Sequence, residues 1–166
     1  MNRTVGSTVI MTLAVIGLLF TMEGSRIYLK AILAQYLLQN AWSDTQNGTV
    51  HSKPWPWADT WPVARLSSVK HSQEMIVLAG ATGRTLAFGP AHLLSSARPG
   101  ETGNTVLVGH RDTHFAFLRH LRPGDLLQLE SVDGIQHTYQ VSDTLVVHEN
   151  STEVMTPDSR KMLTLI

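Results

Sequence analysis

Cysteine is missing from all 166 residues of this sequence. The chain therefore forms no disulfide and no thiolate metal site, and these residues contain no cysteine nucleophile. Charged residues are scarce at 16%, and 13 Lys and Arg balance 13 Asp and Glu. Because nucleic-acid binding usually accompanies a basic excess, we expect no nucleic-acid partner. The low charged fraction indicates that part of the chain lies in lipid.

Charge is also missing from the nineteen residues between Arg3 and Glu23. As a helix this run spans about 28 Å, close to the hydrocarbon thickness of a bilayer. The alternative is a cleaved signal peptide, but "LLFTMEGS" offers only a poor cleavage site. We therefore expect residues 1–24 to be a single-pass anchor in the cytoplasmic (inner) membrane. The following domain is expected on the extracytoplasmic side.

Residues 25–54 are predicted to form a membrane-proximal helix and a linker. In "RIYLKAILAQYLLQNAW", apolar residues recur at Ile27, Ala31, Ala34 and Leu38, which is helical spacing. This helix either continues the anchor and packs on the domain, or binds a partner or the membrane surface. The Pro- and Trp-rich stretch that follows is expected to pack on the domain or at the membrane interface, or to cover a substrate groove.

Short apolar runs separated by turns occupy residues 55–166 and favour a β-barrel or sandwich. The Asp-Gly pair in "SVDGIQ" is a hairpin signal. A single helical turn is predicted at 91–96 and a short helix at 113–121. Strands are predicted at 64–69, 75–80, 105–109, 126–130, 137–147 and 160–166.

The stretch "GNTVLVGHRDTHF" carries the most chemical information, because titratable residues follow a buried strand directly. Three interpretations are open. His110 is a general acid or base, since histidine titrates near neutral pH. Alternatively, His110 and His114 bind a metal with Asp112 or His120. The third interpretation is a hydrogen-bonded loop without chemistry.

The segment "LAFGPAHLLSSARPGETGNTVLVGHRDTHFAFLRHLRPGD", together with "MLTLI", resembles the sortase family. "KAILAQYLLQNAW" and "PWPWADTWPVARL" are similar to the membrane-proximal part of its proteobacterial (marine-type) branch. The resemblance implies an all-β fold: a closed, sortase-like β-barrel of eight strands, behind a transmembrane helix and a membrane-proximal helix. The last strands would lie beyond Ile166, so we expect the barrel to be incomplete and its open apolar edge to make the chain poorly soluble.

The resemblance assigns a catalytic role to His110 and matches Thr164, Leu165 and Ile166 to the first three positions of the family's cysteine motif. The nucleophilic cysteine would follow two positions past Ile166, and a catalytic arginine would lie on the next strand. Arg111 and Asp112 are possible supporting residues, although Asp112 is equally suited to cap the next helix. Ala91 replaces a glycine common in relatives, so we interpret the neighbouring His92 as structural.

The implied function is that of a cysteine transpeptidase or hydrolase that cleaves an LPxTG-like sorting signal through a thioester. Its partners would be the sorting-signal substrate protein, an amine or water acceptor, and the membrane. Neither a metal nor another cofactor is required. The truncated chain would be inactive because it lacks the thiol. The alternative is a catalytically inert, membrane-anchored β-barrel that binds a peptide.

Overall fold

The computed structural model describes residues 3–148 and 150–166, with side chains from residue 10 onward except at 149. The first helix, α1, is followed by a sheet-rich region with short helices between its strands. The elements are α1 (Arg3–Gln46), β1 (Pro62–Ser68), β2 (Gln73–Ala79), α2 (Gly83–Leu86), β3 (Ala91–His92), β4 (Gly103–Val108), η1 (Ala116–His120), β5 (Leu126–Ser131), β6 (Gln136–Gln140), η2 (Thr152–Met155) and β7 (Lys161–Leu165).

Helix α1 is continuous over 44 residues, so the predicted membrane-proximal helix continues the helix of the predicted anchor. The chain divides into two compact units, one ending at Tyr36 and the other covering Leu37–Ile166. Within the described residues, α1 is the one helix long and apolar enough to cross a membrane, with a mean hydropathy of 1.5. The division into an anchor (1–24), a membrane-proximal part (25–54) and a barrel domain (55–166) stays a prediction.

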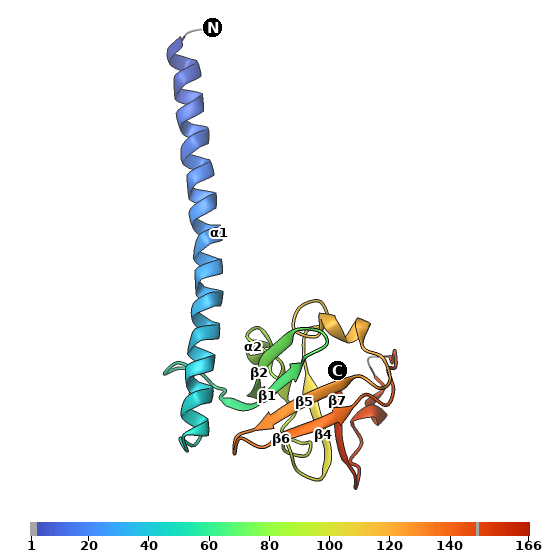
Figure 1. Ribbon diagram of the computed structural model, residues 1–166. Coiled ribbons are helices and arrows are strands. Elements are labelled where there is room, and N and C mark those ends of the chain that lie inside the picture. The colour runs from blue at the N-terminus through green and yellow to red at the C-terminus, as the bar shows by residue number, and fades with distance from the viewer. Residues whose placement is uncertain (1–2, 149) are drawn as a thin grey trace. The chain divides into compact units, whose positions relative to one another are not determined.

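The strands form one seven-stranded sheet in the order β6-β5-β1-β2-β3-β4-β7. The sheet curves around a common interior (Figure 1), and its two terminal strands approach each other where Lys161 Nζ lies 3.4 Å from His137 Nδ1. Most pairs are antiparallel, but β2–β3 and β4–β7 are parallel. The described strands therefore form a nearly closed barrel rather than a fully closed one.

The barrel interior holds the main core. Fully buried side chains of β1, β4 and β5, including Leu66, Leu107 and Leu129, pack with Phe115 and Phe117 from the segment after β4. A second cluster joins Leu38 and Trp42, at the end of α1, to β2 and β3. Burial alternates along β1 and β5, with buried positions separated by partly exposed ones, so one face of each strand turns inward.

Two sequence predictions about local structure are wrong. Residues 91–96 begin with strand β3 instead of a helical turn, because Ala91 and His92 pair with β2 on one side and β4 on the other. The strand predicted at 137–147 ends at Gln140, where its pairing with β5 ends. The hairpin between β5 and β6 is confirmed, and Gly134 has a φ of 79°, which a glycine adopts without strain.

The tryptophans of the linker differ in their packing. Trp55 meets Phe88 edge to face at 4.8 Å between ring centroids, and Trp61 stacks against His51 at 4.2 Å. Trp57 is 83% exposed. Trp55 therefore packs on the barrel unit as expected, Trp61 packs against His51 in the stretch before it, and Trp57 faces solvent.

A substitution pair on β5 tests this arrangement of the core. Leu129→Ala removes a side chain with no exposed surface and is expected to lower the free energy of unfolding by about 2–5 kcal/mol. Leu126→Ala, on the same strand, removes a side chain that is 55% exposed and is expected to cost far less. Chemical unfolding in detergent micelles, followed by tryptophan fluorescence, measures both. Equal losses would contradict the inward orientation of Leu129.

Candidate active site

His110 lies two residues beyond the end of β4, at the point where β7 also ends. Strand β4 is buried almost throughout, whereas His110 is exposed. The parallel ladder of β4 and β7 continues past both strands: the Ile166 amide donates to Leu107 at 2.9 Å, and the Gly109 amide donates to Ile166 at 2.8 Å. The structure thus brings His110, the predicted catalytic residue, close to the predicted motif residues Thr164, Leu165 and Ile166, at the carboxyl ends of β4 and β7.

A compact turn follows His110 and fixes its backbone. The His110 carbonyl accepts hydrogen bonds from the amides of Thr113, at 3.2 Å, and Phe115, at 3.0 Å. The Phe115 ring is buried and packs directly against Gly109, where an added Cβ would lie only 2.8 Å from the ring. Glycine is therefore required before His110 because the ring occupies the space of a side chain.

The aromatic packing continues away from the site and supports this turn. Phe115 meets Phe117 edge to face at 6.2 Å, and Phe117 contacts the His71 ring. His71 and Lys70 both approach the carboxylate of Asp125, whose pKa the hydrogen bond from Lys70 holds at about 2. The segment after His110 thus packs on the hairpin between β1 and β2, and this hairpin in turn bonds to the turn before β5.

Arg111 and Asp112, the possible supporting residues, pair with each other. Arg111 Nε lies 3.5 Å from Asp112 Oδ1, and both side chains are more than three-quarters exposed. Asp112 does not cap the following helix, since η1 begins after Phe115 without a side-chain cap. An exposed pair of this kind contributes little to stability. Both groups remain accessible to a ligand.

His114 faces inward from the same turn. Its Nδ1 is buried and has no hydrogen-bond partner among the described residues. Burial lowers the pKa of His114 below its ordinary value of 6.5, and the nearby His110 lowers it further. Among the side chains that the structure describes, no group of three His, Cys, Asp or Glu that could hold a metal ion is found.

Asn104, which the sequence analysis did not single out, contacts the predicted motif directly. This buried side chain on β4 accepts a hydrogen bond from Thr164 Oγ1 at 2.7 Å. Its amide nitrogen lies 3.3 Å from the Val154 carbonyl and 3.2 Å from the Thr156 carbonyl. Asparagine is uncommon within strands, which is the one signal in the sequence that marks this position.

His92 is held by local hydrogen bonds. Its Nε2 lies 2.9 Å from the Ala97 carbonyl and 3.2 Å from Ser96 Oγ, and burial lowers the pKa of its ring. These contacts agree with a structural role. His92 also lines a cavity of 940 Å³, which none of His110, Arg111, Asp112 or the motif residues lines.

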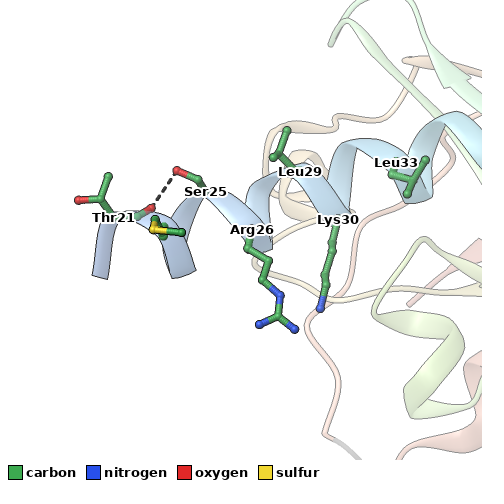
Figure 2. Close-up of a pocket in the computed structure, with 7 residues that line it drawn as sticks. Thr21, Ser25, Arg26, Leu29, Lys30 and Leu33 are labelled. Carbon is green, nitrogen blue, oxygen red and sulfur yellow. Dashed lines mark hydrogen bonds between the residues drawn. The ribbon is translucent and has the colours of Figure 1, made fainter. Parts of the chain in front are cut away.

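A separate hollow lies on helix α1 (Figure 2). It has a volume of 410 Å³, and its seven lining residues all come from this one helix. Ser25 donates a hydrogen bond to the Thr21 carbonyl within it at 2.8 Å. The lining of the hollow contains neither a histidine nor a carboxylate, and none of the predicted site residues lies in it.

Comparison with known proteins assigns the family. Residues 68–166, which include His110 and Thr164 to Ile166, match the family model described as the sortase domain. The chain belongs to the sortase family. This confirms the resemblance seen in the sequence, while the closer similarity to the proteobacterial branch stays a prediction.

Individual sortases give the extent of the likeness. Sortase D from Bacillus subtilis (strain 168) is 34% identical over 92 residues, which are 55% of this chain and 46% of that protein. The chain thus spans about half the length of this curated relative. A Clostridium perfringens sortase D5 transpeptidase has a TM-score of 0.60 at 19% identity, covering 76% of this chain and 77% of the other.

A third sortase was solved with a sorting motif. Clostridium perfringens sortase C, with the C-terminal cell wall sorting motif, has a TM-score of 0.57 at 18% identity. The match covers 82% of this chain and 78% of the sortase C chain. At this identity the two structural relatives establish the fold alone. They confirm that the nearly closed barrel is a sortase fold.

Gly109→Ala tests the packing that orients His110. The added methyl group meets the Phe115 ring at 2.8 Å, so we expect a loss of about 1–3 kcal/mol and altered His110 ring resonances in NMR spectra. The control is Gly83→Ala, where the new methyl group meets nothing within 4 Å. If Gly109→Ala is as well tolerated as the control, Phe115 does not position His110.

The pH dependence of folding tests the burial of His114. Because its folded-state pKa is lowered, the unfolded chain binds more protons, and the stability conferred by neutral His114 is complete above pH 6.5. This stability is lost as the pH falls through the folded-state pKa. His92 acts in the same direction. His114→Leu should therefore reduce the loss of unfolding free energy that occurs as the pH falls below 6.5. Replacing the exposed His120 with Gln should leave this loss unchanged. Identical slopes would contradict the burial of His114.

Proposed function

We propose that this chain is the membrane-anchored part of a sortase-type cysteine transpeptidase in which His110 transfers protons. One observation carries the proposal: the parallel pairing of β4 and β7 ends with the hydrogen bond from Gly109 to Ile166, directly before His110. Whatever follows Ile166 on the same strand therefore starts beside the histidine. An exposed histidine on a rigid strand end is suited to general acid–base work.

The nucleophile is the part of this mechanism that the 166 residues do not contain, since none of them is cysteine. Thr164, Leu165 and Ile166 match the first three positions of the cysteine motif. We therefore place the nucleophilic cysteine two positions past Ile166 and the catalytic arginine on a later strand. Both assignments rest on the motif and on the position of β7 beside β4.

The reaction proceeds in two steps. The thiolate attacks the carbonyl carbon of the scissile peptide bond, and His110 donates a proton to the amine that leaves, which gives a thioester acyl-enzyme. An incoming amine or water then gives a proton to His110 and attacks the thioester, and the thiolate is released. The arginine stabilises negative charge on the carbonyl oxygen. Arg111, held at 3.5 Å by Asp112, is accessible enough to contact the substrate near His110.

The substrate proposed is a protein with an LPxTG-like sorting signal. The solved sortase C with a C-terminal cell wall sorting motif supports this class of substrate, because it shares the fold of this chain. The acceptor is an amine for transpeptidation or water for hydrolysis. Residues 1–24 would anchor the enzyme in the cytoplasmic membrane, since α1 is apolar and long enough to span it. The barrel would lie on the extracytoplasmic side.

A second candidate is a catalytically inert, membrane-anchored module that binds a peptide. The observation in its favour is the exposed surface around His110, where Arg111 and Asp112 are both accessible to a ligand. The barrel would then use the exposed surface around His110 only for recognition. Translation of the gene past Ile166 separates the two functions, because only the enzyme requires a Thr-Cys pair or an equivalent there.

The protein translated through that cysteine and through the later strand with the arginine provides the direct test of function. We expect it to cleave a fluorogenic LPxTG-like peptide in detergent micelles. His110→Gln should lower kcat about 10²–10⁴-fold, because general acid–base catalysis contributes that much. His120→Gln serves as the control, since His120 is an exposed histidine of η1, outside the proposed machinery.

Two results would contradict the proposed enzyme. The first is a continuation of the gene without a cysteine near Ile166. The second is full peptide cleavage by His110→Gln, which would remove the histidine from the proton-transfer steps. Peptide binding without cleavage by the extended protein would instead support the inert module.

A further inference from the structure

Asn104 connects three segments through one buried side chain. It is only 4% exposed and lies on β4, six residues before His110. Its Oδ1 accepts the hydrogen bond from Thr164 on β7, and its Nδ2 donates to the carbonyls of Val154 and Thr156. An asparagine amide has two N–H donors and one carbonyl acceptor, so both kinds of group have partners here.

The bond between Asn104 and Thr164 distinguishes one strand register from its alternatives. In the observed parallel register, Thr164 stands opposite Val106 and Met162 opposite Asn104. A slip by one residue would exchange the two faces of β7, which its packing opposes. A slip by two residues preserves the faces, so the backbone ladder alone discriminates poorly against it.

The side chains of Asn104 and Thr164 distinguish the observed register from a slip by two residues. After a slip by two residues, Met162 or Ile166 would take the place of Thr164, and neither has a hydroxyl group. Asn104 would then lose its hydrogen-bond donor while buried, which is costly. Such a slip would also move the end of β7 by roughly 6.6 Å, because a strand rises about 3.3 Å per residue. The residue beside His110 would change.

We propose that Asn104 is a positioning residue of the active centre: it recognises the Thr164 hydroxyl and so fixes the register that brings the end of β7 to His110. The same amide holds the turn containing η2, which leads into β7, against β4. The consequence for catalysis rests on the proposed function. The register of β7 against β4 does not depend on the proposed function, because it is observed in this chain.

The experiment uses the full chain in detergent micelles and requires no enzyme activity. Thr164→Val removes the hydroxyl group and keeps the branched shape, whereas Thr164→Ser keeps the hydroxyl group. The matched control is Thr105→Val, which removes the buried hydroxyl of the next β4 residue, bonded to the Arg98 carbonyl at 3.1 Å. The measurements are amide hydrogen exchange at Gly109 and Ile166 and the NMR resonances of the His110 ring.

We expect Thr164→Val to accelerate exchange at both amides by about tenfold more than Thr105→Val does. Only Thr164→Val removes a side-chain bond between β7 and β4, whereas the Thr105 hydroxyl bonds to the segment before β4. The His110 resonances should shift, and Thr164→Ser should restore both measurements. Asn104→Ala also removes the bonds to Val154 and Thr156, so it should accelerate exchange more than Thr164→Val does. The double variant should still fall short of the sum of the two effects, because the bond between the two side chains is lost only once. Equal exchange in Thr164→Val and Thr105→Val would overturn the inference, as would additive effects of the two substitutions.

Failure of this inference and failure of the proposed function give different experimental results. If exchange and His110 resonances respond as expected but the protein extended past Ile166 cleaves no peptide, the enzyme proposal fails and the register assignment stands. If the extended protein is active and Thr164→Val leaves its kcat, its KM and the two amides unchanged, the inference fails and the enzyme proposal stands.

Discussion

The parallel pairing of β4 with β7 is the constraint on which the candidate site depends. These strands are distant in sequence, and their ladder runs from Gly103–Lys161 to the bond between Gly109 and Ile166. Without this pairing, His110 would be an exposed histidine at the end of a strand with no partner segment. With it, the histidine and the motif residues lie together at the ends of the two strands, as the proposed active centre requires.

The rest of the barrel keeps this edge rigid. Phe115 fills the space beside Gly109, and the core of β1, β4 and β5 holds the ring in place. At the other end of the ladder, Lys161 meets His137 where the two terminal strands approach. Strongly packed elements thus position a histidine that is itself exposed and accessible to substrate.

Much of the barrel was predictable because strand periodicity and turn residues are local signals. The Asp133-Gly134 hairpin and the buried strand before His110 are examples, and the motif around His110 identified the family. Strand β3 was mispredicted because its two residues owe their conformation to pairing with β2 and β4. The role of Asn104 was not predictable, since its partners Val154 and Thr164 lie 50 and 60 residues away. Local patterns contain no information about such contacts.

The central claim is that the end of β7 lies against the residue before His110. The most direct measurement is the NMR scalar coupling across the hydrogen bond between the Gly109 amide nitrogen and the Ile166 carbonyl carbon, in the isotope-labelled chain in micelles. Our account predicts a detectable coupling and slow exchange of the Gly109 amide. Absence of the coupling, together with exchange as fast as in a solvent-exposed amide, would contradict it.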